Sequence, residues 1–331
     1  MQCAVLGAGI WGTALAVQLA RAGHDTVIWD RNPERCEHMN AEHRNPRYLR
    51  DVSLPHSLRA VPSLSAACEH AELLVPVLPS HALRSVIRRA APSIRPTTSV
   101  CCATKGIEDD TLDTMHAVLT EELPDDHRIS MLYGPSFALE VARGQPTAVV
   151  IAGGDAAAHA AADAFHAGAF RTYHTDDVMG VCIGGSLKNV MAIACGVSDG
   201  VGLGANARAA IITRGLAEIT RLAVALGANP LTLMGLAGMG DLVLTCTGNL
   251  SRNRRVGLAL GQGRTLEDIL EELGEVAEGV VTARSATKLA KRVGVELPIT
   301  EQVHALLDEG KPARQALADL LNRERRAERD D

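Results

Sequence analysis

One lysine stands alone in a long uncharged stretch of the chain. Lys188 is the only charged residue in 178–198, a segment with the pattern of a buried helix. A charge in such a place is costly unless it is paired or functional. Desolvation also lowers the pKa of a lysine, which would suit Lys188 to exchange a proton with a substrate oxygen. The alternative is a lysine that reaches solvent at a helix edge. The small residues at 184–186 favour a functional lysine that a ligand approaches.

Asp241 is the matching acid, because residues 230–251 contain no other charge. We expect it to pair with Lys188 or with a substrate hydroxyl, and a helix cap is the structural alternative. Lys105 follows the apolar stretch Ser99–Ala103. Ligands of open parallel sheets bind beyond the carboxyl ends of the strands, so Lys105 either meets a substrate oxygen there or is a solvent-facing loop lysine.

A basic run precedes a helical stretch further along. It consists of Ser251, Arg252, Asn253, Arg254 and Arg255. Hydroxyl and amide donors, guanidinium groups and a helix N-terminus together make a good phosphate receptor. A solvated basic face is the alternative.

The first residues contain a glycine-rich loop between a predicted strand and a predicted helix. Gly7, Gly9 and Gly12 have the spacing GxGxxG. The first glycine permits a tight turn, the second lets the backbone approach a pyrophosphate, and the third lets helix and strand pack closely. This pattern predicts a dinucleotide site, with NAD or NADP as the cofactor.

The next strand ends at Asp30 and Arg31. An acid here takes the adenosine ribose hydroxyls and favours NAD, whereas an adjacent arginine accepts the 2′-phosphate of NADP. Arg31 could equally face solvent. The sequence is therefore compatible with either cofactor.

The elements that must position these residues fall into two groups. Short apolar strands alternate with helices in the first half, which predicts βαβ units and a largely parallel sheet. The predicted strands are Gln2–Leu6, Asp25–Trp29, Ser57–Val61, Leu73–Leu78, Ser99–Ala103, Ile129–Leu132, Thr147–Ala152 and Phe170–His174. The predicted helices between them are Trp11–Ala22, Ser80–Ala91, Thr111–Glu122, Ser136–Arg143 and Asp155–His166.

Only helical patterns follow. They cover Val178–Val197, Asn206–Leu226, Asn253–Leu260, Thr265–Leu273, Ala277–Val293, Ile299–Asp308 and Ala313–Arg323. We therefore predict an α/β protein with two domains: a Rossmann-like dinucleotide-binding domain over 1–176 and an all-helical domain over 177–331.

Composition narrows the functional classes. The formal charge of −6 argues against a nucleic-acid partner. None of the eight cysteines has zinc spacing, so we expect no metal and a reduced, cytoplasmic protein. The most apolar segment, 178–197, contains Lys188 and several glycines, so we expect a buried helix rather than a membrane span.

Taken together, these segments resemble the bacterial type of NAD(P)-dependent glycerol-3-phosphate dehydrogenase. The resemblance rests on Gly7–Ala16, Ala103–Gly106, Gly134–Ala138, Lys188–Val190, Gly204–Arg208, Gly240–Thr247 and Ser251–Arg255. It implies a Rossmann-like domain, a helical domain and a site between them. It also implies reversible reduction of dihydroxyacetone phosphate to sn-glycerol 3-phosphate, the precursor of glycerophospholipids.

The resemblance also assigns roles. It implies that Lys188 exchanges the proton at the C2 oxygen, with Lys105 and Asp241 as its catalytic neighbours. The implied substrate contacts are Lys105, Gly134, Ser136, Lys188, Asp241, Ser251, Arg252 and Asn253. The implied cofactor contacts, beyond the loop glycines, Asp30 and Arg31, are Ile10, Trp11, Lys105, Ala138, Arg252, Val276 and Glu278.

Some residues depart from the family's usual pattern. Ile10 stands where members often carry serine, and Ser136 where threonine is commoner. Pro76 removes a hydrogen-bond donor from a predicted strand, so we expect an irregularity there. The alternative functions are a β-hydroxyacid dehydrogenase of the 6-phosphogluconate type and a non-catalytic redox sensor that binds NAD(P)H. The apolar helical domain is compatible with a homodimer.

Overall fold

The structure, a computed structural model, describes residues 1–124, 128–273, 277–324 and 327–328. Its N-terminal part is built on one eight-stranded sheet in the order β3-β2-β1-β4-β5-β6-β7-β8. The strands are β1 (Gln2–Leu6), β2 (Asp25–Trp29), β3 (Leu58–Val61), β4 (Leu73–Pro76), β5 (Ser99–Cys102), β6 (Arg128–Tyr133), β7 (Thr147–Gly153) and β8 (Phe170–Thr175). Each predicted strand is confirmed to within two residues at either end.

The sheet is largely parallel, as predicted, with one reversal. β6 and β7 pair antiparallel, and every other pair of neighbouring strands is parallel. The carboxyl ends of β1, β4 and β5 therefore meet at one edge, where the glycine loop and Lys105 emerge.

Helices cover both faces of this sheet. They are α1 (Ile10–Arg21), α2 (Pro33–Glu42), α3 (Leu64–His70), α4 (Ser80–Ala90), α5 (Met115–Glu122), α6 (Ala138–Ala142) and α7 (Asp155–Phe165), with a short 3₁₀ turn at Ala91–Ser93. Successive residues of a strand point to opposite faces of the sheet and pack in different cores. In β1, Cys3 and Val5 pack in the core that contains α1 and α7. Ala4 and Leu6 pack in the core that contains α3, α4 and α5. Burial on both faces explains the continuously apolar strands.

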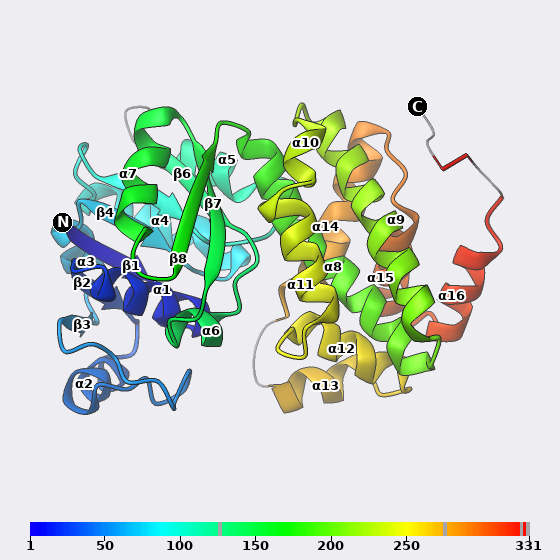
Figure 1. Ribbon diagram of the computed structural model, residues 1–331, viewed down its shortest axis with the longest axis horizontal. Coiled ribbons are helices and arrows are strands. Elements are labelled where there is room, and N and C mark those ends of the chain that lie inside the picture. Colours follow the sequence, from blue (N-terminus) through cyan, green and yellow to red (C-terminus); the bar gives the residue numbers. More distant parts are fainter. Residues whose placement is uncertain (125–127, 274–276, 325–326, 329–331) are drawn as a thin grey trace.

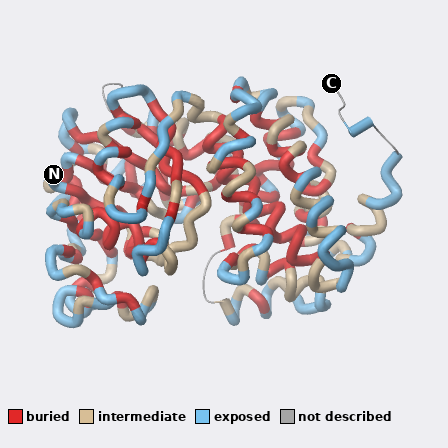
Figure 2. The backbone as a smooth tube through the Cα atoms, viewed as in Figure 1, coloured by how far each residue is buried: buried red, intermediate tan, exposed pale blue. Residues whose placement is uncertain are grey.

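In the described part of the chain beyond 177, every element is helical (Figure 1). These are α8 (Val178–Val201), α9 (Gly204–Ala225), α10 (Pro230–Leu233), a π-helical turn η2 (Leu236–Gly240), α11 (Asp241–Thr247), α12 (Arg252–Gly261), α13 (Leu266–Leu273), α14 (Glu278–Val293), α15 (Pro298–Asp308) and α16 (Ala313–Leu321). The buried stretches of this half run through α8 and its neighbours (Figure 2).

Within the part of the chain that the structure describes, two helical segments are apolar and long enough to cross a membrane, Val178–Val201 and Pro230–Thr247. The most apolar window of the first is 83% buried inside the protein, and that of the second is 39% buried. A core helix passes the same test of length and composition. The burial of α8 agrees with its interpretation as a core helix.

Several elements differ from the prediction. The pattern missed α2, in which only Cys36 and Met39 are buried, and the short elements α3, α10, η2 and α11. The helix predicted from Thr111 begins only at Met115, because Leu112 has φ of 66° and Thr114 caps the helix. The expected irregularity at Pro76 is present as the end of the strand: β4 stops there and pairs with β5 at only two positions.

Candidate active site between the two domains

The three predicted catalytic side chains meet where the sheet joins the helical part. Lys188 of α8 donates to Oδ1 of Asp241 at 2.7 Å, and Lys105, from the loop after β5, donates to Oδ2 at 2.7 Å. Asp241 is the first residue of α11, and its carboxylate binds the two lysines instead of capping the helix. The expected pairing of Lys188 with Asp241 is therefore present, and Lys105 completes it.

The cluster is withdrawn from solvent. Asp241 is 1% exposed and Lys188 is 8% exposed. Burial lowers the pKa of Lys188 to about 8; the Asp241 carboxylate opposes this shift and the charge of Lys105 adds to it. Burial alone would raise the pKa of Asp241, but the charges and hydrogen bonds of the two lysines lower it. The site thus holds a carboxylate between two lysines, one of which can give up its proton near neutral pH.

Thr245 belongs to this cluster and was missed from sequence. Lys188 donates to Thr245 Oγ1 at 2.8 Å, and the threonine hydroxyl donates to the carbonyl oxygen of Asp241 at 2.6 Å. Its position four residues after Asp241, one helical turn along, was the available signal. Two oxygens therefore orient the Lys188 ammonium group.

The Lys105 loop is tied to α8 as well as to its own sheet. The Gly106 N–H donates to Ser186 Oγ at 3.1 Å, two residues before Lys188. Thr104 Oγ1 accepts a bond from the Leu78 N–H at 2.9 Å. The bond between the Lys105 loop and α8 thus helps to position the two lysines relative to each other.

The predicted dinucleotide loop has the geometry that such a ligand requires. Gly7 has φ of 116°, and a Cβ there would lie 2.4 Å from the Val77 carbonyl oxygen. A Cβ on Gly12 would lie 1.9 Å from the Gly7 carbonyl oxygen. A Cβ on Gly9 would meet no atom within 4 Å, so the backbone there borders open space. Gly9 precedes α1 without a side-chain cap, which leaves N–H groups of the first turn for a phosphate.

Asn45 anchors this loop and was not predicted. Its side-chain amide donates to the Ala8 carbonyl at 3.0 Å and to Thr13 Oγ1 at 2.9 Å. Of the predicted cofactor contacts nearby, Ile10 begins α1, whereas Trp11 and Ala138 are partly buried against the same core of the sheet.

The two residues that bear on cofactor preference differ in exposure to solvent. Asp30 is buried, and its carboxylate accepts from the Asn32 N–H at 2.9 Å and from Arg35 Nη1 at 2.8 Å. Arg31, the next residue, is exposed. The acid is thus held by its own chain, and the arginine faces outward.

Three residues of the basic run bind other groups of the protein. Ser251 caps α12 by accepting from the Arg254 N–H at 3.2 Å, and Asn253 Oδ1 accepts from the Gly279 N–H at 3.0 Å. Arg254 is bound to Asp199 at 2.7 Å, so it is not a free phosphate ligand as the run suggested. Arg252 begins α12, and its charge weakly opposes the burial that raises the pKa of Glu278.

Glu278 spans the junction directly. Ser80, at the start of α4, donates to Glu278 Oε2 at 3.0 Å. Burial raises the pKa of the Glu278 carboxyl group. Val276, the other cofactor contact predicted in this region, lies outside the described residues.

The turn from Gly134 to Ser136 also borders the helical part. Ser136 Oγ donates to the Gly134 carbonyl at 2.9 Å within this turn. α6 begins after the turn, at Ala138 and not at the predicted Ser136. A Cβ on Gly240, the residue before Asp241, would lie 3.5 Å from the Pro135 ring. The predicted residues of this turn therefore lie against the segment that carries Asp241.

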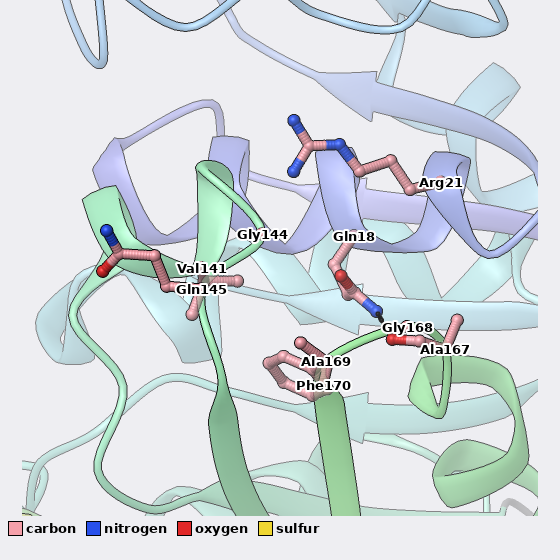
Figure 3. A pocket seen from close by; sticks show the side chains of 9 residues that line it. All are labelled: Gln18, Arg21, Val141, Gly144, Gln145, Ala167, Gly168, Ala169 and Phe170. Carbon is pink, nitrogen blue, oxygen red and sulfur yellow. Dashed lines mark hydrogen bonds between the residues drawn. The ribbon is translucent and has the colours of Figure 1, made fainter.

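A separate hollow is lined by residues of α1, of α6 and the turn after it, and of the turn from α7 into β8, among them Gln18, Arg21, Gly144 and Phe170 (Figure 3). None of the predicted site residues lines it. Among the described residues, no group of three His, Cys, Asp or Glu side chains could hold a metal ion.

A glycine-loop α/β domain joined to a helical domain through a buried lysine–carboxylate cluster defines a two-domain, nicotinamide-dependent oxidoreductase. Residues 2–159 match the family described as NAD-dependent glycerol-3-phosphate dehydrogenase N-terminus, and residues 177–318 match its C-terminus. The chain belongs to the NAD-dependent glycerol-3-phosphate dehydrogenase family.

Individual relatives agree over nearly full length. The glycerol-3-phosphate dehydrogenase [NAD(P)+] of Geobacter sulfurreducens is 53% identical over 98% of both chains. That of Anaeromyxobacter dehalogenans is 52% identical over 99% of this chain and all of the relative. The crystal structure of glycerol-3-phosphate dehydrogenase from Coxiella burnetii has a TM-score of 0.93 and 42% identity, covering 97% of this chain and 98% of the other. This membership decides against the hydroxyacid dehydrogenase and the sensor, and the family is one of soluble enzymes.

Proposed function

We propose that this chain reduces dihydroxyacetone phosphate reversibly to sn-glycerol 3-phosphate with NADH or NADPH, and that Lys188 is the proton donor and acceptor. The observation that carries the proposal is the Lys105–Asp241–Lys188 cluster, in which both lysines contact one buried carboxylate. The product would serve glycerophospholipid synthesis.

The glycine loop fits a nicotinamide dinucleotide, because Gly7 and Gly12 pack too closely for side chains while Gly9 borders open space. When bound there, this cofactor supplies a hydride to C2 of the substrate. The residues proposed to hold it are Gly7, Gly9, Ile10, Trp11, Gly12, Asp30, Arg31, Lys105, Ala138, Arg252, Val276 and Glu278.

Lys188 handles the proton. In the reducing direction its ammonium group donates a proton to the C2 oxygen as the carbonyl becomes an alcohol, and the neutral amine takes it back in the oxidation. The lowered pKa supports this role, since a group that titrates near pH 8 can serve both directions. Lys105 stabilises the negative charge that develops on the same oxygen.

The remaining proposed substrate contacts orient the molecule. Arg252 would bind the phosphate, with Ser251 and Asn253 beside it and the α12 N-terminus behind them. Gly134 and Ser136 would border the substrate from the sheet side. A phosphate held away from the reacting carbon orients that carbon through remote binding energy.

Three further assignments are proposed. The domain boundary falls between 176 and 177, a position supported by the end of β8 at Thr175 and the start of α8 at Val178. A homodimer would cover the exposed apolar side chains of Leu231 and Met234. Cytoplasmic localisation suits eight free, buried cysteines.

The test is oxidation of NADH and of NADPH by the purified protein with dihydroxyacetone phosphate, beside 6-phosphogluconate with each oxidised cofactor. Rapid oxidation with the triose phosphate alone is expected. Turnover only with 6-phosphogluconate, or cofactor binding without any turnover, would overturn the proposed activity.

A further inference from the structure

The aromatic residue Tyr133, at the end of β6, lies beside the Lys105 loop. It is completely buried and no part of the proposed reaction uses it. We propose that Tyr133 is a positioning residue that holds the Lys105 ammonium group against Asp241. This inference rests on the proposed role of Lys105 at the substrate oxygen.

The first contact is made by the phenol. Tyr133 Oη donates to the carbonyl oxygen of Thr104 at 2.5 Å. Thr104 directly precedes Lys105, so this bond fixes the backbone from which the lysine side chain departs. A buried hydroxyl needs a partner, and Tyr133 finds it on this loop.

The second contact is made by the ring. Lys105 Nζ lies over the ring of Tyr133, 5.4 Å from its centroid, which is within the range of a cation–π interaction. The same ammonium group donates to Asp241 at 2.7 Å. The charged end of Lys105 is therefore held by a carboxylate and an aromatic ring, and its backbone by the phenol of the same tyrosine.

The helical domain holds the ring in turn. A Cβ on Gly185 of α8 would lie 3.2 Å from Cγ of Tyr133, so only a residue without a side chain packs there comfortably. The next residue, Ser186, accepts from the Gly106 N–H on the other side of Lys105. Thr104 and Gly106, the two neighbours of Lys105, are thus bound by Tyr133 and by α8.

Repulsion between two positive charges explains why Lys105 needs a second partner. Lys105 and Lys188 share one carboxylate, so each ammonium group raises the free energy of keeping the other one charged. Lys188 has Thr245 as an additional partner, and Lys105 has the Tyr133 ring. The ring offers negative electron density to a cation without adding a negative charge, because burial raises the pKa of the Tyr133 phenol.

A double-mutant cycle tests the inference. Tyr133→Leu removes ring and phenol, and it is expected to lower kcat/KM for dihydroxyacetone phosphate about tenfold. In a Lys105→Met background, the same replacement is expected to change the residual kcat/KM by less than about twofold, because the residue acts through Lys105. Tyr133→Phe keeps the ring and loses only the phenol, so it should fall between wild type and Tyr133→Leu.

Tyr173→Leu, at an exposed position of β8, is the matched control and should leave kcat/KM unchanged in both backgrounds. Equal losses from Tyr133→Leu with and without Lys105 would show a merely structural role and overturn the inference. If Tyr133→Leu does not fold, as judged by circular dichroism, the same cycle with Tyr133→Phe decides. Full activity of Lys105→Met would remove the basis of the inference while leaving the proposed reaction intact.

Discussion

The ammonium nitrogen of Lys188 lies 2.7 Å from Oδ1 of Asp241, although the two residues are 53 positions apart in the chain. Breaking a buried pair of this kind leaves an uncompensated charge, so Asp241 and Lys188 depend on each other. The pair orients the nitrogen and keeps the carboxylate ionised. Replacing Lys188 is therefore expected to affect the reaction rate, and replacing Asp241 to affect the pKa of Lys188.

Replacing Lys188 should abolish most of the turnover without lowering the affinity for the cofactor. We expect Lys188→Met to lower kcat by about a thousandfold, within the range that a general acid contributes. Cofactor affinity, measured by fluorescence titration with NADPH, should stay within about twofold of wild type. The exposed lysine Lys288 provides a control, as Lys288→Met should be fully active. Substantial turnover by Lys188→Met would end its proposed role.

The pH profile should report the pKa of Lys188. Because this pKa is lowered to about 8 and the reduction needs the ammonium form, kcat for dihydroxyacetone phosphate should fall as pH rises through about 8. The oxidation needs the amine and should rise over the same range. Asp241→Asn removes the carboxylate that favours the ammonium form, so the descending limb should move to lower pH. A limb that stays in place would contradict the assignment.

Cofactor preference should depend on the partner of Asp30. Arg35→Ala frees the Asp30 carboxylate to accept ribose hydroxyls and to repel a 2′-phosphate. We expect the ratio of kcat/KM for NADPH to that for NADH to fall about tenfold. Arg59→Ala, which removes an exposed arginine of β3, is the control. An unchanged ratio, or one that rises, would show that Asp30 does not face the adenosine.

A buried acid away from the site should make stability depend on pH. Glu218 of α9 accepts bonds from the Ile299 and Thr300 N–H groups at the start of α15. Burial raises its pKa to about 7 from 4.5. Its contribution is therefore fully present below the unfolded value and is lost as pH rises through about 7.

We expect this group to make the free energy of unfolding fall by on the order of 3 kcal/mol between pH 4.5 and pH 8. Glu218→Gln should flatten that slope, as measured by urea denaturation at several pH values. Glu309→Gln, at an exposed position, should keep the wild-type slope. Parallel slopes for wild type and Glu218→Gln would contradict the prediction.

The thiols should be inert in the native protein. All eight cysteines are free and buried, and burial raises the pKa of Cys3 and of Cys68 to about 12. Since the thiolate is the reactive form, Ellman's reagent should label less than about one thiol in an hour at neutral pH. Eight should react in denaturant. Fast labelling of a native thiol would reveal an opening that the structure does not contain.

Local patterns were sufficient for much of the fold. The strands were predictable because continuous apolar runs must be buried between two layers of helices. α2 was not, because only Cys36 and Met39 among its ten residues are buried. α11 was not predictable either, because the glycine-rich segment 235–240 directly precedes it and contains the π-helical turn instead of a helical pattern.

The site was predictable where isolated charge signalled it. Each of Lys188 and Asp241 is the only charge in an apolar segment, which predicts Lys188 or a substrate hydroxyl as the partner of Asp241. Residues that act through distant contacts gave no such signal. Asn45 and Tyr133 depend on loops that only the tertiary fold brings near, and Arg254 is bound by Asp199, 55 positions away.

The bond between Gly106 and Ser186 limits how the enzyme can open. It joins the loop of one domain to the core helix of the other at the point where both lysines depart. A hinge that swung the domains apart as rigid bodies would break this bond and separate the proton donor from its charged neighbour. While this bond holds, the two lysines keep one spacing, so a motion that leaves it intact admits the substrate without taking the proton donor away from its charged neighbour.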